Sequence, residues 1–312
     1  MFQYIQRRLL IMIPVLWGVT TVVFFLMYML PGDPASTILA QSGGRAEAVE
    51  RLREQLGLDQ PVPVQYVRFL RNAVRGDFGD SIFLRQPVIE VLRSNLPPTL
   101  ALAIAGTIVA LAIGFSMGIL AALNHNTAVD RLCMITAIAG VSMPNFWLAL
   151  LLMYAISALN TYYGVLVLPI TGQGDLKHLL VPALVLGFAT SGQLARLVRS
   201  SMLEVMHQEY IITARAKGLR HRVVILRHAL RNALIPVVTM LGLQFGALLG
   251  GTVIIETVFS RRGLGRTIVD AILWKDLPIV QGGVLLTAAL YMFVNLLVDL
   301  SYALIDPRIR YS

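Results

Sequence analysis

Charged residues are scarce in this sequence: they make up 14% of its 312 residues, whereas hydrophobic residues make up 56%. Soluble domains carry about 25% charged residues. The deficit excludes an ordinary soluble protein, and with it a soluble nucleic-acid binder, although the formal net charge is +9. Cys133 is the single cysteine, so an intramolecular disulfide is excluded, and we interpret it as a small buried apolar residue.

Several catalytic signatures are also missing. The sequence has three lysines, and none follows Gly and precedes Ser or Thr, as a phosphate-binding loop requires. Its five histidines have no metal-ligand spacing with the cysteine or with one another. The Gly-x-Ser-x-Gly turn of a hydrolase is absent as well. We therefore predict no catalytic residue, no metal site and no cofactor in this chain, so that any ATP would be hydrolysed by another subunit.

Long hydrophobic runs dominate what is present. A bilayer core of about 30 Å requires about 20 apolar residues in a helix, and six segments qualify: 9–30, 99–123, 133–158, 179–200, 233–258 and 279–305. The first run is longer than the apolar region of a signal peptide, so we expect a retained helix. Arg196 and Arg199 weaken the fourth segment, and we expect them to extend to the interface. The prediction is an all-α integral membrane protein with six transmembrane helices.

Basic residues in the short loops predict the orientation of the chain. Thirteen Lys and Arg but only four acids lie on the side that holds both termini and the loop 201–232. The opposite side has its basic residues mainly in the long segment 31–98, where eight acids match eight basic residues. We expect a multi-pass protein of the bacterial inner membrane with cytoplasmic N- and C-termini, and we interpret the positive charge as a topology signal.

Segment 31–98 reads as short helices outside the cytoplasm. We predict one over 44–57, one that starts at Pro61 to Pro63, and one from Pro87 to about Asn95, with a turn cluster over 76–80. Pro97-Pro98 is expected to separate the last of these from the second span. Its matched charges indicate a solvated surface, and a docking surface for an external partner is the alternative.

Within the predicted spans, small residues recur at every fourth position, as close helix packing requires. The second span has Gly106, Ala110, Gly114, Gly118 and Ala122, and the fifth has Gly242, Gly246 and Gly250. A stripe that lines a conduit or a subunit interface is the alternative to packing inside the bundle. Polar residues at membrane depth are unusual and often functional. The candidates for a translocation path are Ser142, Asn145, Gln193, Gln244, Glu256, Asn295 and Asp299.

Structural roles compete with the path for these polar residues. Glu256 lies near the end of its span, where an interfacial role is the alternative. Asn295 and Asp299 could pair with a neighbouring helix, and Gln193 and Gln244 could join two helices. Pro144 is expected to kink the third span.

The cytoplasmic stretch from Glu204 to Pro236 is too long for a simple turn. Helix-spaced apolar residues precede Gly218 and others follow it, so we predict a helix, a glycine turn and a second helix that project as a knob. The basic side chains of the knob would face water or an acidic partner.

This stretch resembles the cytoplasmic loop of binding-protein-dependent ABC importer permeases. The family pattern is Glu-Ala-Ala, three residues, Gly, nine residues, then Ile-x-Leu-Pro. With its glycine at Gly218, Ala214 and Leu230 match, whereas Ile212, Thr213, His228 and Arg231 depart. Ala-Lys-Gly at 216–218 and His-Ala-Leu-Arg-Asn at 228–232 are similar to the peptide- and nickel-type variant of the loop.

The resemblance covers nearly the whole chain. Pro31-Gly32-Asp33-Pro34, Gly76-Asp77-Phe78-Gly79, residues 96–100, residues 142–147, GGTVIIETVF at 250–259 and Asp306-Pro307-Arg308-Ile309-Arg310 are similar to the B-type subunit of that subfamily. One departure is Arg262, where the family usually has proline before Gly-Leu-Gly. It puts the local turn in question.

The resemblance implies a type I ABC importer (MetI-like) permease fold. Residues 1–98 would hold the first transmembrane helix and a periplasmic helical insertion, and 99–307 the transmembrane domain with its coupling loop 201–235. The implied function is translocation of di- or oligopeptides across the inner membrane, with a nickel complex or glutathione as the alternative solute. The chain would have no ATPase site of its own.

The implied partners are a second homologous permease subunit, two ABC ATPase subunits that bind ATP and Mg, and a periplasmic or extracellular substrate-binding protein. The implied ATPase-coupling residues are Ala214, Arg215, Ala216, Lys217, Gly218, Leu219, Arg220 and Arg222.

Two other functional classes remain open on the residues alone. A stand-alone secondary transporter would favour buried ionisable pairs, and none is evident in the sequence. A membrane enzyme would need a nucleophile–base pair or a metal cluster at membrane depth, and none is evident either.

Overall fold

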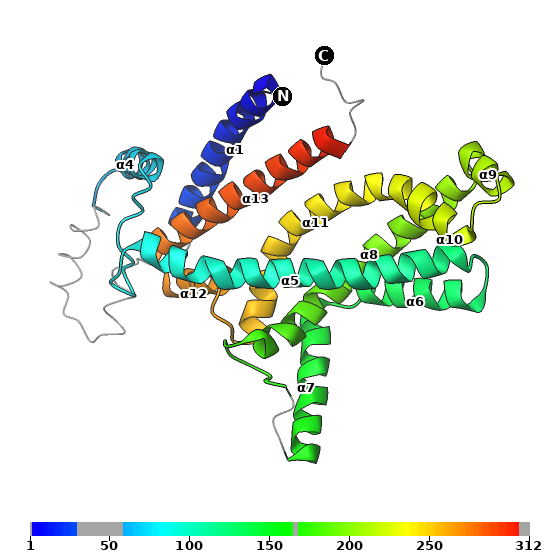
Figure 1. Cartoon of the computed structure of the whole chain (residues 1–312). Helices are drawn as coiled ribbons and strands as arrows, with labels where there is room; N and C mark the ends of the chain where they lie inside the picture. The colour runs from blue at the N-terminus through cyan, green and yellow to red at the C-terminus, as the bar shows by residue number, and fades with distance from the viewer. Residues whose placement is uncertain (1, 30–58, 165–167, 306–312) are drawn as a thin grey trace. The chain divides into compact units, whose positions relative to one another are not determined.

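A computed structural model describes residues 2–29, 59–164 and 168–305 of the chain. The described residues fold mainly into helices (Figure 1). They divide into two compact units. Of the described residues, unit 1 comprises 2–29, 59–99 and 262–296, and unit 2 comprises 100–164, 168–261 and 297–305. The helices are α1 (Phe2–Met29), α4 (Val62–Val74), α5 (Val88–Leu123), α6 (Ala128–Ser142), α7 (Asn145–Tyr163), α8 (Leu176–Met206), α9 (Glu209–Ala216), α10 (His221–Val223), the π-helical segment η1 (Val224–Ala229), α11 (Leu230–Val258), α12 (Leu264–Trp274) and α13 (Leu277–Ile305).

Five helices of the described part are long and apolar enough to cross a membrane: Gln6–Met29, Val88–Leu123, Asn145–Tyr163, Leu176–Met206 and Leu277–Val298. A bent pair, His221–Leu234 with Pro236–Gly250, makes a sixth span if the two helices are counted together. The pair bends by 46°, and Pro236 explains the bend because it lacks the N–H that a helix needs. The predicted all-α membrane architecture is confirmed.

The third predicted span, 133–158, is not one helix. Helix α6 ends at Ser142 and α7 begins at Asn145, because Met143 precedes Pro144 and is extended (φ −81°, ψ 128°). The proline therefore breaks the helix, where the sequence predicted only a kink. Figure 1 shows α7 leaving the α5–α6 pair at a steep angle.

Unit 1 has a core in which distant parts of the chain meet. Val88, Val91 and Leu92 of α5 pack with Leu264 of α12 and Ile279 of α13, and all five are buried. The start of α12 is capped from α5, since the Leu264 N–H donates to the Thr99 hydroxyl at 2.7 Å. Residues 262–296 therefore belong with the N-terminal segment in one packed unit.

A loop over 76–87 is attached to this core through one buried carboxylate. Asp276, at the α12–α13 junction, is fully buried and accepts hydrogen bonds from the Ser81 hydroxyl and from the Phe83 N–H. The Phe83 ring stacks on Trp274 with 4.2 Å between centroids. Positive φ angles at Gly76 and Gly79 confirm the predicted turn cluster.

The expectations for segment 31–98 have different outcomes. The helix that was predicted to start at Pro61 to Pro63 is α4 and is confirmed; the helix over 44–57 lies outside the described residues. The prediction that Pro97-Pro98 ends a separate helix is wrong, because α5 runs through both prolines from Val88 to Leu123. Burial of Leu92 and Thr99 on either side of the pair stabilises the helix despite the lost N–H groups.

Unit 2 packs closely around α8. A Cβ on Gly114 would lie 2.9 Å from Leu194, and a Cβ on Gly118 would lie 2.6 Å from Val198, so the glycines of α5 are the surface against which α8 packs. Gly192 of α8 lies so close to α6 that a Cβ would lie 2.0 Å from the Ala137 carbonyl oxygen. The predicted packing role of the stripe in α5 is confirmed. In α11 the surroundings are mixed, because Gly242 contacts Val298, whereas Gly250 has open space beside it.

Candidate coupling surface

The cytoplasmic loop of the sequence prediction folds as a helix, a turn and a second helix. Helix α9 ends at Ala216 and α10 begins at His221, with Gly218 between them at φ +76°. This left-handed backbone strongly favours glycine. The α9–α10 segment lies where α8 ends and the helix of α10, η1 and α11 begins (Figure 1). The predicted fold of the loop is confirmed, and η1 adds a π-helical stretch that the sequence did not indicate.

A buried apolar cluster fixes this segment on the rest of unit 2. Ile211 and Ala214 of α9 pack with Val224, Ile225 and Ala229 of η1 in a cluster that also contains Leu194, Val198 and Met202 of α8. A polar contact joins α9 to α11, since the Asn232 side-chain amide donates to the Tyr210 hydroxyl at 2.8 Å. The knob is therefore seated on the membrane helices by its inner face.

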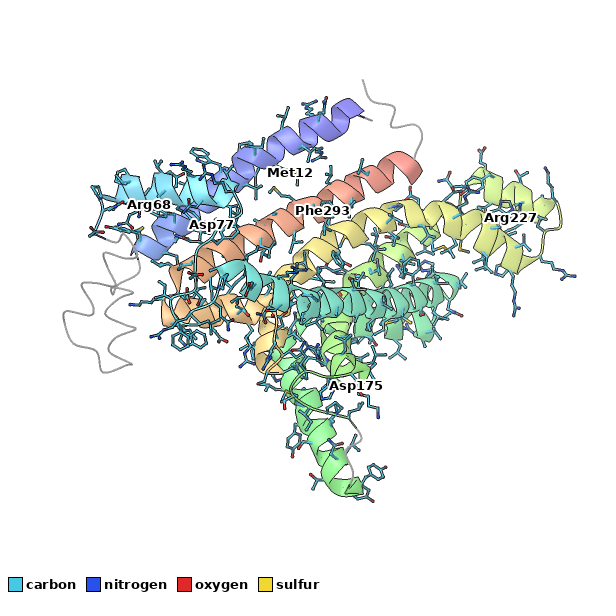
Figure 2. All side chains as sticks on the ribbon, turned by 60° about the vertical axis from the view of Figure 1, so that its left-hand side comes forward. Met12, Arg68, Asp77, Asp175, Arg227 and Phe293 are labelled. Carbon is cyan, nitrogen blue, oxygen red and sulfur yellow. The ribbon has the colours of Figure 1, made fainter. Side chains whose placement is uncertain are left out.

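Its outer face is basic. Seven of the eight predicted coupling residues are exposed: Arg215, Ala216, Lys217, Gly218, Leu219, Arg220 and Arg222. Ala214 is only 7% exposed and belongs to the buried cluster, which corrects its predicted place on the contact surface. Figure 2 shows Arg227 on the same projecting segment.

An ion-pair cluster joins the C-terminal part of α8 to the start of α6. The sequence did not predict it. The Arg199 Nε donates to Asp130 Oδ1 at 2.7 Å and its second terminal nitrogen donates to Asp130 Oδ2 at 2.8 Å. Asp130 Oδ2 also accepts from the Asn126 N–H at 3.0 Å and lies 3.3 Å from His125 Nδ1. These bonds join the end of α5, the start of α6 and α8 below the knob.

The hydrogen bonds of this cluster keep the buried carboxyl group of Asp130 ionised. Asp130 is 4% exposed, and the hydrogen bonds from Arg199 hold the pKa of its carboxyl well below the usual range. Arg199 was expected to extend to the interface, but it is paired instead. The signal in the sequence was an isolated aspartate at a helix start, which gains meaning only when its partner, 69 residues later, is known.

Two of the candidate path residues lie together in the described part of unit 2. Gln193 and Gln244 meet, since the Gln244 amide nitrogen lies 3.3 Å from Gln193 Oε1 and 3.4 Å from the Thr190 carbonyl oxygen. These bonds join α8 to α11, which supports the interhelical alternative. Ser142 and Asn145 flank the break between α6 and α7.

The remaining candidates lie on α11 and α13. Glu256 is 1% exposed near the end of α11, close to Arg261, whose guanidinium donates to the His178 carbonyl oxygen at 2.8 Å. Asn295 lies on α13 in unit 1, and the side chain of Asp299 is not among those described. Within the described residues, no group of three His, Cys, Asp or Glu side chains could hold a metal ion.

The chain matches two family descriptions over almost its whole length. Residues 114–311 match "Binding-protein-dependent transport system inner membrane component", and residues 1–103 match the N-terminal region of the corresponding membrane component.

Similar proteins agree with these matches. The chain is 43% identical over 312 residues, all of both chains, to the glutathione transport system permease protein GsiC of Escherichia coli (strain K12). It is 44% identical over the same length to the protein of that name from Salmonella paratyphi A.

Solved structures share the fold. An inward-facing structure of the MetNI methionine ABC transporter has a TM-score of 0.57 at 19% identity, covering 69% of this chain and 96% of that one. An amino acid ABC transporter has a TM-score of 0.51 at 15% identity, covering 71% of this chain and 95% of that one. On the matched residues and the full-length relatives, this chain belongs to the family of inner membrane components, the permeases, of binding-protein-dependent transport systems.

Proposed function

We propose that this chain is one of two permease subunits of an ABC importer, and that partner ATPases drive it through the knob around Gly218. The observation that carries this proposal is the knob itself: an exposed basic turn held by a buried apolar cluster on the end of α8 and the start of α11. A rigid knob of this kind transmits a push on its outer face directly to two long helices. Such a surface has no purpose in a carrier that works alone.

The driving force would come from outside the chain. ATP-dependent closure of two ATPase subunits would favour one state of the permease over another, and the differential contact at the knob would carry that preference to the helices. The chain supplies no phosphate-binding loop, so ATP and Mg would be held by the partners. A second permease subunit and an external substrate-binding protein complete the machine, with both termini of this chain in the cytoplasm.

The solute we propose is a short peptide. The relatives with 43 to 44% identity are permeases of glutathione, itself a tripeptide, which makes glutathione the first solute to test within this class. A nickel complex is the other solute that the subfamily resemblance suggests. Uptake of labelled glutathione, a dipeptide and a nickel complex by the assembled importer, each in competition with the others, separates these three.

Coupling is tested by changing the charge of the knob. In the full assembly, Gly218→Glu and the double variant Arg220→Glu, Arg222→Glu should lower ATPase recruitment and uptake together. Arg131→Glu is the matched control, because Arg131 is also an exposed arginine of the predicted cytoplasmic side but lies outside the knob. If the knob variants recruit the ATPases and import solute as well as the control does, the proposal is wrong.

A further inference from the structure

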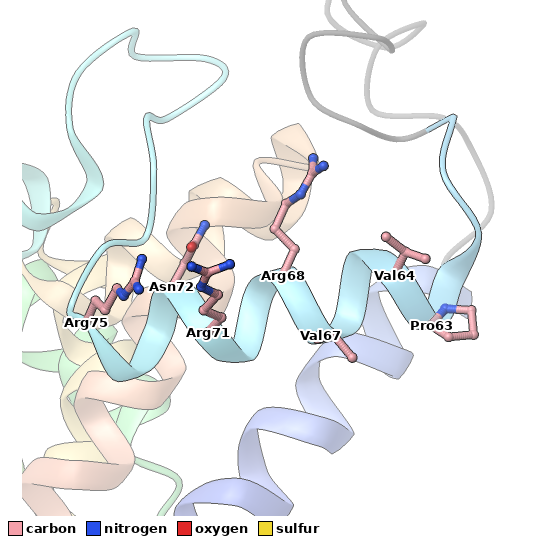
Figure 3. Close-up of a pocket in the computed structure, with 7 residues that line it drawn as sticks. All are labelled: Pro63, Val64, Val67, Arg68, Arg71, Asn72 and Arg75. Atoms are coloured by element: carbon pink, nitrogen blue, oxygen red, sulfur yellow. The ribbon is translucent and has the colours of Figure 1, made fainter.

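Helix α4 packs on the last turns of the membrane-spanning helix α1. The Tyr66 hydroxyl lies 2.6 Å from the Thr21 hydroxyl. The Phe24 ring lies 5.3 Å from the ring of Tyr66 and stacks on Phe69 at 6.0 Å between centroids. In Figure 3, α4 crosses in front of α1. One face of α4 therefore packs against the C-terminal end of the transmembrane helix α1.

This contact fixes the depth of α4 in the bilayer. The span in α1 runs from Gln6 to Met29, and Thr21 lies about 12 Å before its end at a rise of about 1.5 Å per residue. The span of 24 residues is about 36 Å long and the hydrocarbon core about 30 Å thick, so Thr21 and Phe24 lie about 5–9 Å below the acyl boundary. The side chains of α4 that contact them therefore reach the depth at which interfacial helices bury their apolar face. The free face of α4 then meets phospholipid headgroups.

The free face of α4 combines basic and aliphatic side chains. Arg68, Arg71 and Arg75 are exposed along one side, where they line an open groove (Figure 3). Val64 and Val67 lie among them and are 48% and 62% exposed. The helix and its C-cap contain no acidic residue, although segment 31–98 as a whole has matched charges. Positive charge is thus concentrated on this one helix.

That combination fits a phospholipid surface better than water or a purely polar partner. The guanidinium group pairs with phosphate oxygens through two parallel hydrogen bonds. Interfacial helices bury aliphatic side chains at the acyl boundary and keep their basic residues at the headgroups. Aromatic residues such as Tyr66 are also typical of this depth.

We propose that α4 is an interfacial helix that binds the phosphate groups of anionic phospholipids through Arg68, Arg71 and Arg75. Binding there fixes the outgoing end of α1 at a set depth while other helices move. The proposal does not depend on which solute the importer carries, nor on the action of the knob.

The test measures which lipid lies against α4. The full-length chain with Cys133→Ala and Val67→Cys carries a fluorophore at position 67 and is reconstituted into vesicles. Lipids with the same nitroxide-labelled acyl chain and either a phosphatidylglycerol or a phosphatidylcholine headgroup then quench the fluorophore. We expect the anionic lipid to quench about two- to fivefold more strongly, and the ratio to fall in about 1 M salt.

Matched variants decide the assignment. The triple change of Arg68, Arg71 and Arg75 to Gln should bring the ratio to about one, whereas the same triple change to Lys, which keeps the charge, should preserve most of it. Arg85→Gln with Arg93→Gln, at exposed positions outside α4, should leave the ratio unchanged.

Three results would overturn the proposal. One is a ratio of one in the parent chain, and another is an equal loss in the Arg85 and Arg93 control. The third is a label quenched by aqueous iodide but not by lipid, and protected only when an acidic substrate-binding protein is added; that result would assign the face to a protein.

Discussion

Removing the carboxylate of Asp130 should destabilise the contact between α6 and the C-terminal part of α8, and so lower the free energy of unfolding. The carboxylate is 4% exposed and bonds to Arg199 through both oxygens, at 2.7 and 2.8 Å. Exposed ion pairs contribute about 0–1 kcal/mol, and breaking a fully buried pair costs about 3–5 kcal/mol. Since the Arg199 side chain is 24% exposed, we expect Asp130→Asn to cost about 2 kcal/mol.

The assay is thermal unfolding of the full-length chain in detergent, followed by the loss of its monodisperse elution peak. A cost of about 2 kcal/mol corresponds to about 4–8 °C for a unit of this size. Asp270→Asn is the control, because Asp270 forms a partly exposed i,i+4 pair with Arg266 at the longer distance of 3.6 Å, and its loss should cost a few tenths of a kcal/mol.

The pH dependence of this difference has a definite sign. The pKa of Asp130 is lowered in the folded chain, so its contribution is complete above the unfolded pKa of about 3.9 and is lost as the pH falls below it. The gap between parent and Asp130→Asn should therefore be constant from about pH 6 to pH 8 and shrink below about pH 4. The reasoning fails if Asp130→Asn unfolds at the temperature of the Asp270→Asn control near neutral pH.

Three further substitutions have predicted outcomes. Gly218→Val should lower ATP-driven uptake most, Gly218→Ala less and Gly218→Asn least. A residue with a side chain loses about 1 kcal/mol of stability at φ +76°, and Asn tolerates this conformation best. Equal uptake by the three variants would contradict this prediction. Gly192→Ala should destabilise the chain by about 1–3 kcal/mol, since its Cβ would meet the Ala137 carbonyl at 2.0 Å. Gly250→Ala, with open space around it, should not destabilise it, and thermal unfolding that ranks the two the other way would refute the packing argument. Asp276→Ala leaves two donors of the 76–87 loop without an acceptor and should cost about 2–3 kcal/mol; limited proteolysis should then cut that loop faster, and an unchanged cutting rate would count against the anchoring role.

The sequence predicted the features that rest on local chemistry. The apolar runs predicted the membrane helices, and the helical spacing on either side of Gly218 predicted the two-helix knob. The prolines at 61 and 63 predicted the start of α4, and the small residues of the second span predicted a close contact, which α8 makes. In each of these, the residues that carry the signal are neighbours in one element.

Features that depend on tertiary contacts were missed or misplaced. Pro97-Pro98 was predicted to end a helix, but α5 continues through both prolines because its side chains are packed on either side of them. The pairing of Asp130 with Arg199 joins residues 69 positions apart, which no local pattern records. Ala214 matches the family loop, yet its small side chain faces the core.

The polar residues of the spans show the same limit. A polar side chain at membrane depth can face a conduit or satisfy a neighbouring helix, and both use the same residue types. The bonds from Gln244 to Gln193 and Thr190 favour the second role for that pair. The path through the permease therefore stays a prediction for the other candidates.

Transport by the isolated chain is the most direct test of the account, whose central claim is that this permease is moved by partner ATPases. The chain alone and the complete importer are reconstituted into vesicles, and uptake of labelled peptide is measured with and without ATP. We predict ATP-dependent uptake by the importer and, for the chain alone, uptake no faster than in protein-free vesicles. Rapid uptake by the chain alone, independent of ATP, would contradict the account.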